Sequence, residues 1–565
     1  MLSRLKTYLG RFSATERKLL LVLFVLLAAG IILSFWADSR GRVTVPGQGG
    51  EYSEGLAGAP QHINPLLAPS NDVDQDLSRV VYAGLYKFDP DLNLTPDLAE
   101  SLPQVAGGGK EYTITLRENL YWQDGHKLTA DDAVYTFQTI QNPNYQMPSS
   151  VRLSWNQVAV EKIDERRVKI TTREASGTFI ANLTVGLLPK HVWETVPAES
   201  FGLSKFNLEP VGSGAFQVAE IRRGRDGQIR EIRLRPFARY HGGRPFLKSL
   251  IFKFYPTTDG LISAYQKGEI MGLGFVPYDQ SLFLRPRGMN QFELPLPQYQ
   301  AVFINRAKNP APLEDARVRL ALAKSVNKEH IIKEVFGGHA GGAYGPILPG
   351  MLGYHEEIPG APMNLYDETA ARALLDQAGW IMDAATGFRR DKLGRIITLE
   401  LATNNFSPNV RVAEILKRTW EGIGIQIILR IESTADLESK FIRPRAYELL
   451  LYSENTGADP DPYPYWHSSQ LRNPGVNLST FRSNETDKLL AEARGILSPE
   501  ERAKRYRRFQ ELFVGDVPAV FLTRSVYVYN VSTQVKGLDL KTVVLPAERF
   551  ADINKWYIAT KRVKR

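Results

Sequence analysis

The chain has 565 residues, of which 43% are apolar and 23% charged, and it contains no cysteine. This composition is that of a folded protein and excludes disordered, collagen-like and disulfide-stapled classes. The absence of cysteine excludes a thiol nucleophile, a cysteine zinc site, an iron–sulfur cluster and a lipid-modified cysteine. At roughly 150 residues per domain, the length predicts about three domains.

The net charge of +9 is concentrated at the two ends of the chain. Residues 1–18 hold five basic residues and one acidic residue, and four of the last five residues are basic. The remainder is nearly neutral, whereas a nucleic-acid-binding protein carries a basic surface along its body. The sequence therefore predicts no nucleic-acid partner.

Residues 19–36 form an uncharged apolar run, LLLVLFVLLAAGIILSFW. As a helix this run would be about 27 Å long, close to the roughly 30 Å hydrocarbon core of a bilayer. A cleaved signal peptide is the alternative, but it needs small residues at its exit, where Phe35 and Trp36 stand. We predict an uncleaved transmembrane anchor at 19–36, after a cytoplasmic basic segment at 1–18 and before a flexible Gly-rich linker at 37–50. The protein would then lie in the cell membrane as a single-pass protein, with the bulk of the chain outside the cytoplasm.

The stretch 110–141 combines a strand, a turn and a helix. Residues 111–116 alternate between apolar and polar, which is typical of a half-buried strand. Thr129 begins a helix, and Asp132 stands at the position that completes a capping box. Asp315 and Asp367 are similarly expected to cap helices, with a further helix at 411–420 and a strand at 425–431. Alternating helices and strands indicate an α/β fold with a partly parallel sheet.

The segment 112–140, YTITLRENLYWQDGHKLTADDAVYTFQTI, closely resembles a signature of the peptide/nickel-type solute-binding proteins of ABC importers, the dipeptide- and oligopeptide-binding proteins of family 5. Further segments resemble that family in the same order along residues 50–550. They are 62–66 (HINPL), 81–85 (VYAGL), 188–191 (LPKH), 210–216 (PVGSGAF), 315–327 (DARVRLALAKSVN), 366–380, 422–425 (GIGI), 458–462 (ADPDP) and 466–469 (WHSS).

The resemblance implies a two-lobed α/β clamshell of the periplasmic-binding-protein class with an extra inserted domain. Lobe I would comprise residues 51–93, 208–297 and 525–565, the inserted small domain 94–207, and lobe II 298–524. Residues 298–305 and 521–529 have strand-like sequences and are candidates for the segments that cross between the lobes as a hinge. Plain core strands are the alternative interpretation of both.

Enzymatic motifs do not occur. The sequence has no H-E-x-x-H pair, no G-K-[ST] after its Gly-rich stretch and no G-x-S-x-G nucleophile elbow. We therefore expect no enzymatic activity, no catalytic or metal-binding residue and no cofactor.

Candidate ligand-binding residues follow from the resemblance. In peptide-binding members, the Asp of an A-D-Y-x-[DE]-P-like motif pairs with the peptide α-ammonium, and Asp459 of the segment 458–462 (ADPDP) matches that motif with one residue fewer. Asp-Pro-Asp-Pro is also a rigid turn sequence, so a purely local role is the alternative. Tyr452 and Asn455 are candidates by proximity, and Glu54 resembles an acidic position that faces the cleft in some members.

Together these features predict a membrane-anchored, monomeric receptor that captures peptides between two lobes and hands them to ABC permease subunits. A ligand that contacts both lobes would shift the equilibrium towards the closed form. Two alternatives remain open: a receptor of the same fold for a non-peptide solute, such as a nickel chelate or a glycan, and a tethered sensor without a transport role.

Overall fold

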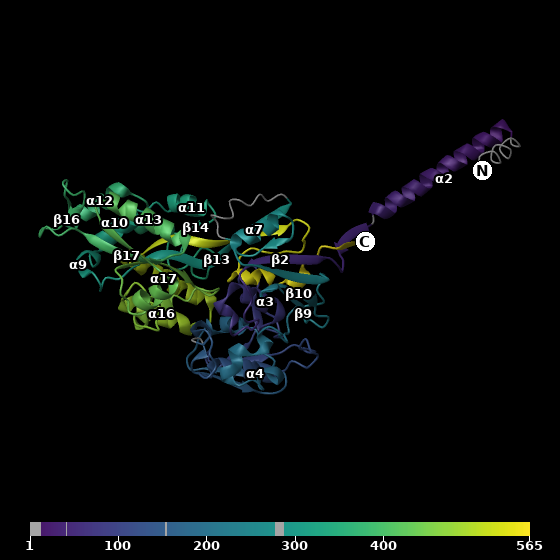
Figure 1. Ribbon diagram of the computed structural model, residues 1–565, viewed down its shortest axis with the longest axis horizontal. Helices are drawn as coiled ribbons and strands as arrows, with labels where there is room; N and C mark the ends of the chain where they lie inside the picture. Colours follow the sequence, from purple (N-terminus) through teal and green to yellow (C-terminus); the bar gives the residue numbers. More distant parts are fainter. Residues whose placement is uncertain (1–12, 41, 153–154, 277–287, 565) are drawn as a thin grey trace.

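The computed structural model describes residues 13–40, 42–152, 155–276 and 288–564. The body has two hydrophobic cores, and the α/β parts around them are called lobe I (around β2, Glu51–Ala57, and β11, Ser249–Tyr255) and lobe II (around β17, Thr398–Asn404, and β19, Leu449–Asn455) below. A smaller unit with its own sheet, called the inserted domain, lies below lobe I in Figure 1, while helix α2 (Ala14–Arg40) projects away from the body. Within the described residues, one mixed sheet runs through both lobes. Its strands, in spatial order, are β18 (Gln426–Glu432), β17 (Thr398–Asn404), β19 (Leu449–Asn455), β13 (Met289–Ile304), β20 (Ala519–Ser532), β12 (Gly272–Leu273), β2 (Glu51–Ala57), β11 (Ser249–Tyr255), β10 (Ile229–Pro236) and β9 (Phe216–Arg223), and β14 (Gly341–Gly342) pairs with β20.

Strands β13 and β20 belong to both lobes. They pair antiparallel, from Met289 opposite Ser532 at one end to Phe303 opposite Ala519 at the other. Residues 292–294 and 527–531 pack in the hydrophobic core of lobe I, whereas residues 299–304 and 519–522 pack in the separate core of lobe II. The register shifts between Pro295 and Tyr299, where the two cores part. The strand-like segments predicted at 298–305 and 521–529 thus lie in the two strands that connect the lobes.

The inserted part of the chain forms its own antiparallel sheet. The strand order is β5 (Gln104–Ala106), β6 (Glu111–Thr115), β8 (Arg167–Thr172) and β7 (Val158–Lys162), and helix α4 (Ala130–Gln141) packs against it. The capping box of α4 forms as predicted, since the Thr129 N–H donates to Asp132 Oδ2 at 2.9 Å. The apolar side chains of this domain are continuous with the core of lobe I, around α3 (Asp72–Val81).

Helices cover both faces of the lobe II sheet (Figure 1). They are α10 (Ala316–Lys324), α11 (Lys328–Phe336), α12 (Glu368–Gln377), α13 (Ser407–Gly422), α16 (Asn484–Gly495) and α17 (Pro499–Asp516). Asp315 and Asp367 cap α10 and α12 as predicted, and Gly379 after α12 has a φ of 86°. Strand β17 pairs parallel to both of its neighbours, which confirms the partly parallel sheet.

The remaining short elements connect these units. Among them are β3 (Tyr86–Phe88), β4 (Leu94–Pro96), α5 (Ser149–Arg152), α6 (Lys190–Trp193), α7 (Thr258–Gln266), α9 (Pro310–Leu313), β15 (Ile381–Met382), β16 (Arg389–Arg390), α14 (Thr434–Asp436), α15 (Tyr463–Trp466) and the 3₁₀ helix η10 (Pro546–Phe550).

The N-terminal region differs from the expected linker. Helix α2 extends to Arg40, and residues Arg42–Pro46 form strand β1, which pairs with β21 (Thr560–Lys564) near the C-terminus. The sequence RVTVP is rich in β-branched residues, so it pairs once a partner strand lies beside it. Residues 1–12 of the predicted basic segment lie outside the described residues. Among the residues described, no helix combines the length and the apolar character needed to cross a membrane.

Candidate ligand-binding site

The Asp-Pro-Asp-Pro segment connects β19 to helix α15, and its second carboxylate serves the local structure. Asp461 Oδ1 accepts the Tyr463 N–H at 3.1 Å, and its Oδ2 pairs with Arg494 Nε at 2.7 Å. The Arg494 guanidinium in turn lies 4.2 Å from the centre of the Tyr463 ring. Asp461 therefore stabilises the turn and ties it to α16.

Asp459 has a different environment. Its Oδ2 pairs with Arg502 Nη2 on α17 at 2.8 Å, and the side chains of Asp459 and Arg502 are only 19% and 8% exposed. Among the described residues, Asp459 Oδ1, two nitrogens of Arg502 (Nε and Nη1) and the Tyr506 hydroxyl have no hydrogen-bond partner. A buried polar atom without a partner costs about 1–3 kcal/mol. This cluster thus holds hydrogen-bonding capacity that the described residues do not use.

Burial also sets the protonation of this carboxyl. It raises the pKa of Asp459 to about 6, against the opposing effect of the Arg502 charge. Asp459 is therefore mostly ionised at neutral pH but becomes protonated in mildly acidic solution.

The cluster lies where lobe II meets the inserted domain. The Gly177 N–H of the inserted domain donates to the Arg494 carbonyl of lobe II at 3.0 Å. A Cβ atom on Gly177 would lie 3.0 Å from Arg502 Nη1, so this loop packs directly on the arginine. A ligand group at Asp459 would consequently be enclosed between two parts of the molecule.

Tyr452 and Asn455 lie on β19, just before this segment. Tyr452 faces Ala301 of β13 in register, packs against the lobe II core and has its pKa raised by burial. Asn455 is exposed; its side chain accepts the Gly457 N–H at 2.8 Å, and its carbonyl accepts the Tyr465 hydroxyl at 2.6 Å. Both residues support the chain that leads to Asp459, and their contact with a ligand stays a prediction.

Glu54 lies in a buried ionic network inside lobe I. Its Oε1 is 2.9 Å from Arg549 Nη2, and the same guanidinium pairs with Asp76 at 2.6 Å. The hydroxyls of Tyr52 and Tyr529 both donate to Glu54 Oε2. Burial raises the pKa of Glu54, and the Arg549 charge opposes that rise. The network joins β2, β20 and η10, while a ligand contact of Glu54 stays a prediction.

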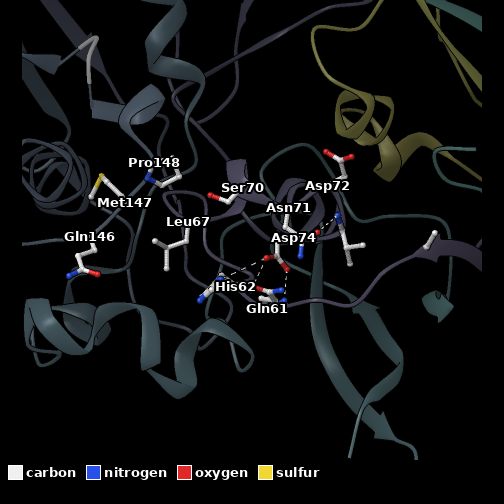
Figure 2. A pocket seen from close by; sticks show the side chains of 12 residues that line it. Gln61, His62, Leu67, Ser70, Asn71, Asp72, Asp74, Gln146, Met147 and Pro148 are labelled. Carbon is white, nitrogen blue, oxygen red and sulfur yellow. Dashed lines mark hydrogen bonds and ion pairs between the residues drawn. The ribbon is translucent and has the colours of Figure 1, made fainter. Parts of the chain in front are cut away.

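A cavity of about 700 Å³ opens between lobe I and the inserted domain (Figure 2). Residues 70–74 around the start of α3 line one side, and residues 146–148 of the inserted domain line another. The buried Asp74 carboxylate fixes the rim, since it accepts the Gln61 and His62 N–H groups at 2.7 and 2.9 Å (Figure 2). The volume of this cavity is within the range of small-molecule sites, about 300–1,000 Å³.

Sequence reasoning missed Arg502, Arg494 and Gly177. Each stands in a segment with no motif of its own, and the two arginines belong to ordinary charged helices. Only the packing of α16 and α17 behind the Asp-Pro-Asp-Pro segment brings them to the site.

Two hydrophobic cores joined by strands β13 and β20 give a fold in which two parts can move relative to each other about those strands. Residues 93–475 match the bacterial extracellular solute-binding proteins, family 5, over the middle region of that family. The chain belongs to this family of extracytoplasmic, non-enzymatic binding proteins of ABC importers, which confirms the resemblance and the prediction that it is not an enzyme.

Individual relatives extend over nearly the whole chain. The oligopeptide-binding protein AppA of Bacillus subtilis is 27% identical over 554 residues, covering 96% of this chain and 98% of AppA. The dipeptide-binding protein of Escherichia coli is 26% identical over 503 residues, covering 85% of this chain and 90% of the relative. The solved structure of B. subtilis AppA in complex with a nonapeptide superposes with a TM-score of 0.71 at 26% identity, covering 91% of this chain and all of AppA.

Proposed function

We propose that this protein captures peptides between its two lobes and delivers them to an ABC permease. The similarity to an oligopeptide-binding protein that was solved with a nonapeptide supports peptide as the ligand class. Lobe I would comprise 51–93, 208–297 and 525–565, the inserted domain 94–207, and lobe II 298–524. The register shift of β13 between Pro295 and Tyr299 is the position at which the lobes would hinge.

The observation that carries the proposal is the unsatisfied polar cluster at Asp459. A peptide α-ammonium needs an anionic partner once it is removed from water, and Asp459 Oδ1 has a free acceptor site among the described residues. The free N–H groups of Arg502 offer donors to a peptide carbonyl in the same place. Tyr452, Asn455 and Glu54 are proposed as further ligand-lining positions.

The test compares two peptides and three proteins by isothermal titration calorimetry. One peptide has a free amino terminus, and the other is the same peptide with an N-acetyl group. Removal of one partner from a buried charge pair costs about 2–5 kcal/mol, so the Asp459→Asn variant should bind the free peptide at least tenfold more weakly than the wild type. The acetylated peptide should bind both proteins with similar affinity.

Asp539→Asn, at an exposed position in lobe I, is the matched control and should bind as the wild type does. Equal affinity of wild type and Asp459→Asn for the free peptide would remove the ammonium-pairing role.

One relative favours a second candidate ligand class. Heme-binding protein A of Haemophilus influenzae is 26% identical over 511 residues, as similar as the dipeptide-binding relative. A non-peptide solute, such as a heme, a nickel chelate or a glycan, would then fill the interior. Native mass spectrometry of the purified chain distinguishes the two ligand classes. A series of co-purified peptide masses supports a peptide ligand, and one defined non-peptide mass supports a non-peptide solute. A tethered sensor without transport would bind solute but fail to support uptake in cells.

The segment 19–36 is also proposed to attach the protein to the membrane. In α2, the described side chains of Leu19 through Leu27 are apolar and exposed, at 41–70%. The full chain should stay in the membrane pellet after carbonate extraction, because residues 19–36 of the sequence form one uncharged apolar run. Leu23→Arg/Leu27→Arg should release it, whereas Leu365→Arg, an exposed position on the body, should not. Release of the wild type by carbonate would contradict the anchor.

A further inference from the structure

Three metal-ligating side chains converge on the inserted domain, in a place the proposed function does not use. Asp124 and His126 lie in the turn after β6, and His191 lies in the short helix α6. Asp124 Oδ2 is 2.8 Å from His191 Nε2 and 3.1 Å from His126 Nδ1. The two imidazole rings stack with their centres 4.1 Å apart. In the part of the chain that the structure describes, no other group of three such side chains has its ligand atoms within 4.8 Å of one another.

Backbone hydrogen bonds hold the turn in this shape. The Trp122 N–H donates to the His126 carbonyl at 2.8 Å, and the Gly125 N–H donates to the Trp122 carbonyl at 2.9 Å. The Trp122 side chain is itself fully buried in the core. Asp124 and His126 are thus presented by a turn whose base cannot move freely, which lowers the cost of organising a site.

The helix that carries His191 is anchored as well. The Lys190 N–H donates to the buried Asp132 carboxylate at 2.9 Å, and Trp193 is 1% exposed. Helix α6 is therefore fixed to α4, and its His191 ring meets the ligand atoms of the turn in the folded backbone as it stands.

The donor set identifies the class of ion. Two imidazole nitrogens and one carboxylate oxygen suit first-row transition ions, whereas Ca²⁺ and Mg²⁺ prefer oxygen ligands alone. Both imidazoles present a ring nitrogen to the same carboxylate oxygen, so the three ligand atoms converge on one point. A divalent cation between them would satisfy all three groups at once.

The surroundings leave room for such an ion and its other ligands. The side chains of Asp124, His126 and His191 are 29%, 64% and 29% exposed, so water or a solute group can complete the coordination. We propose that Asp124, His126 and His191 form a binding site for a divalent transition ion of the Zn²⁺ or Cu²⁺ type. The site is independent of Asp459, which lies in lobe II.

The first test is calorimetric titration of the full chain, in detergent, with ZnCl₂. One equivalent should bind, and His126→Ala should weaken the affinity at least tenfold because it removes one of three protein ligands. His126 is largely exposed, so this substitution leaves the fold intact. His330→Ala, at an exposed position in lobe II, is the control and should bind as the wild type does. Lack of saturable binding by the wild type, or equal binding by His126→Ala, would overturn the proposal.

The second test identifies the side chains that coordinate the metal ion. Cu²⁺ added to the wild type should give an electron paramagnetic resonance spectrum with nitrogen splitting from two imidazoles, reduced to one in His126→Ala. An unchanged spectrum in that variant would place the copper elsewhere and refute the site. Peptide binding should be unaffected in His126→Ala. If the metal site is refuted, the proposed peptide-binding function is therefore not contradicted.

Discussion

Replacement of Arg549 by methionine is expected to destabilise lobe I strongly. The Arg549 side chain is 1% exposed and pairs with two carboxylates, Glu54 and Asp76, which are 0% and 7% exposed. Methionine keeps an unbranched apolar side chain at this position but removes the charge. Glu54 and Asp76 would then be buried without a cation.

The magnitude follows from that burial. Removal of one partner from a buried ion pair costs about 3–5 kcal/mol, because the other charge stays desolvated. At about 2–4 °C per kcal/mol for a domain of this size, the unfolding transition of lobe I should fall by about 6–20 °C. Differential scanning calorimetry of the full chain, with Arg225→Met as an exposed control, measures the shift.

The loss should depend on pH in a defined direction. Burial raises the pKa values of Glu54 and Asp76, and the Arg549 charge lowers them, so removal of Arg549 raises both pKa values further above their unfolded values. The folded variant then holds protons that the unfolded chain releases, and its stability increases as the pH falls. The deficit relative to the wild type should therefore be larger at pH 8 than at pH 5.

A triple variant separates lost charge from lost packing. Glu54→Gln/Asp76→Asn/Arg549→Met has no buried charge in this network and should regain more than half of the lost stability. A deficit below about 1 kcal/mol in Arg549→Met, or one that is the same at pH 5 and pH 8, would refute the reasoning.

Three further predictions concern other parts of the molecule. Peptide affinity should fall severalfold between pH 7 and pH 5, because Asp459 has a pKa of about 6 and only its ionised form pairs with an ammonium group; Asp459→Asn should show no such dependence. Gly212→Ala should lower the free energy of unfolding by more than about 2 kcal/mol, because the new Cβ would lie 1.9 Å from the Val81 carbonyl oxygen. The control Gly202→Ala, whose new Cβ has no described atom within 4 Å, should lower that free energy far less. Equal losses of stability in the two variants would contradict this explanation. Burial lowers the pKa of Lys328 to about 7, so above that pH the unfolded chain binds more protons than the folded protein. The free energy of unfolding, measured by chemical denaturation, should therefore rise from pH 7 to pH 10. Lys328→Met should abolish this rise.

Features that depend on neighbouring residues followed from the sequence. The caps at Thr129, Asp315 and Asp367 form because each side chain reaches a backbone N–H two or three residues ahead. The strands at 298–305 and 521–529 followed from runs of β-branched and aromatic residues. The family was also predictable, because its motifs recur in order along most of the chain.

The candidate site was only half predictable. Asp459 stood out by its motif, but nothing local distinguished it from Asp461 as the carboxylate with an unsatisfied oxygen. That difference arises from the positions of Arg494 and Arg502 on two later helices, and helix packing depends on the whole of lobe II.

Glu54 shows what only the tertiary structure decided. A glutamate near the start of a strand is usually a solvated surface charge, yet here its partner Arg549 is 495 residues away in the sequence. The segment 42–46, expected to be part of a linker, likewise pairs with residues 560–564. Local composition determines capping and strand propensity, whereas burial and pairing across such separations depend on contacts that exist only after the chain has folded.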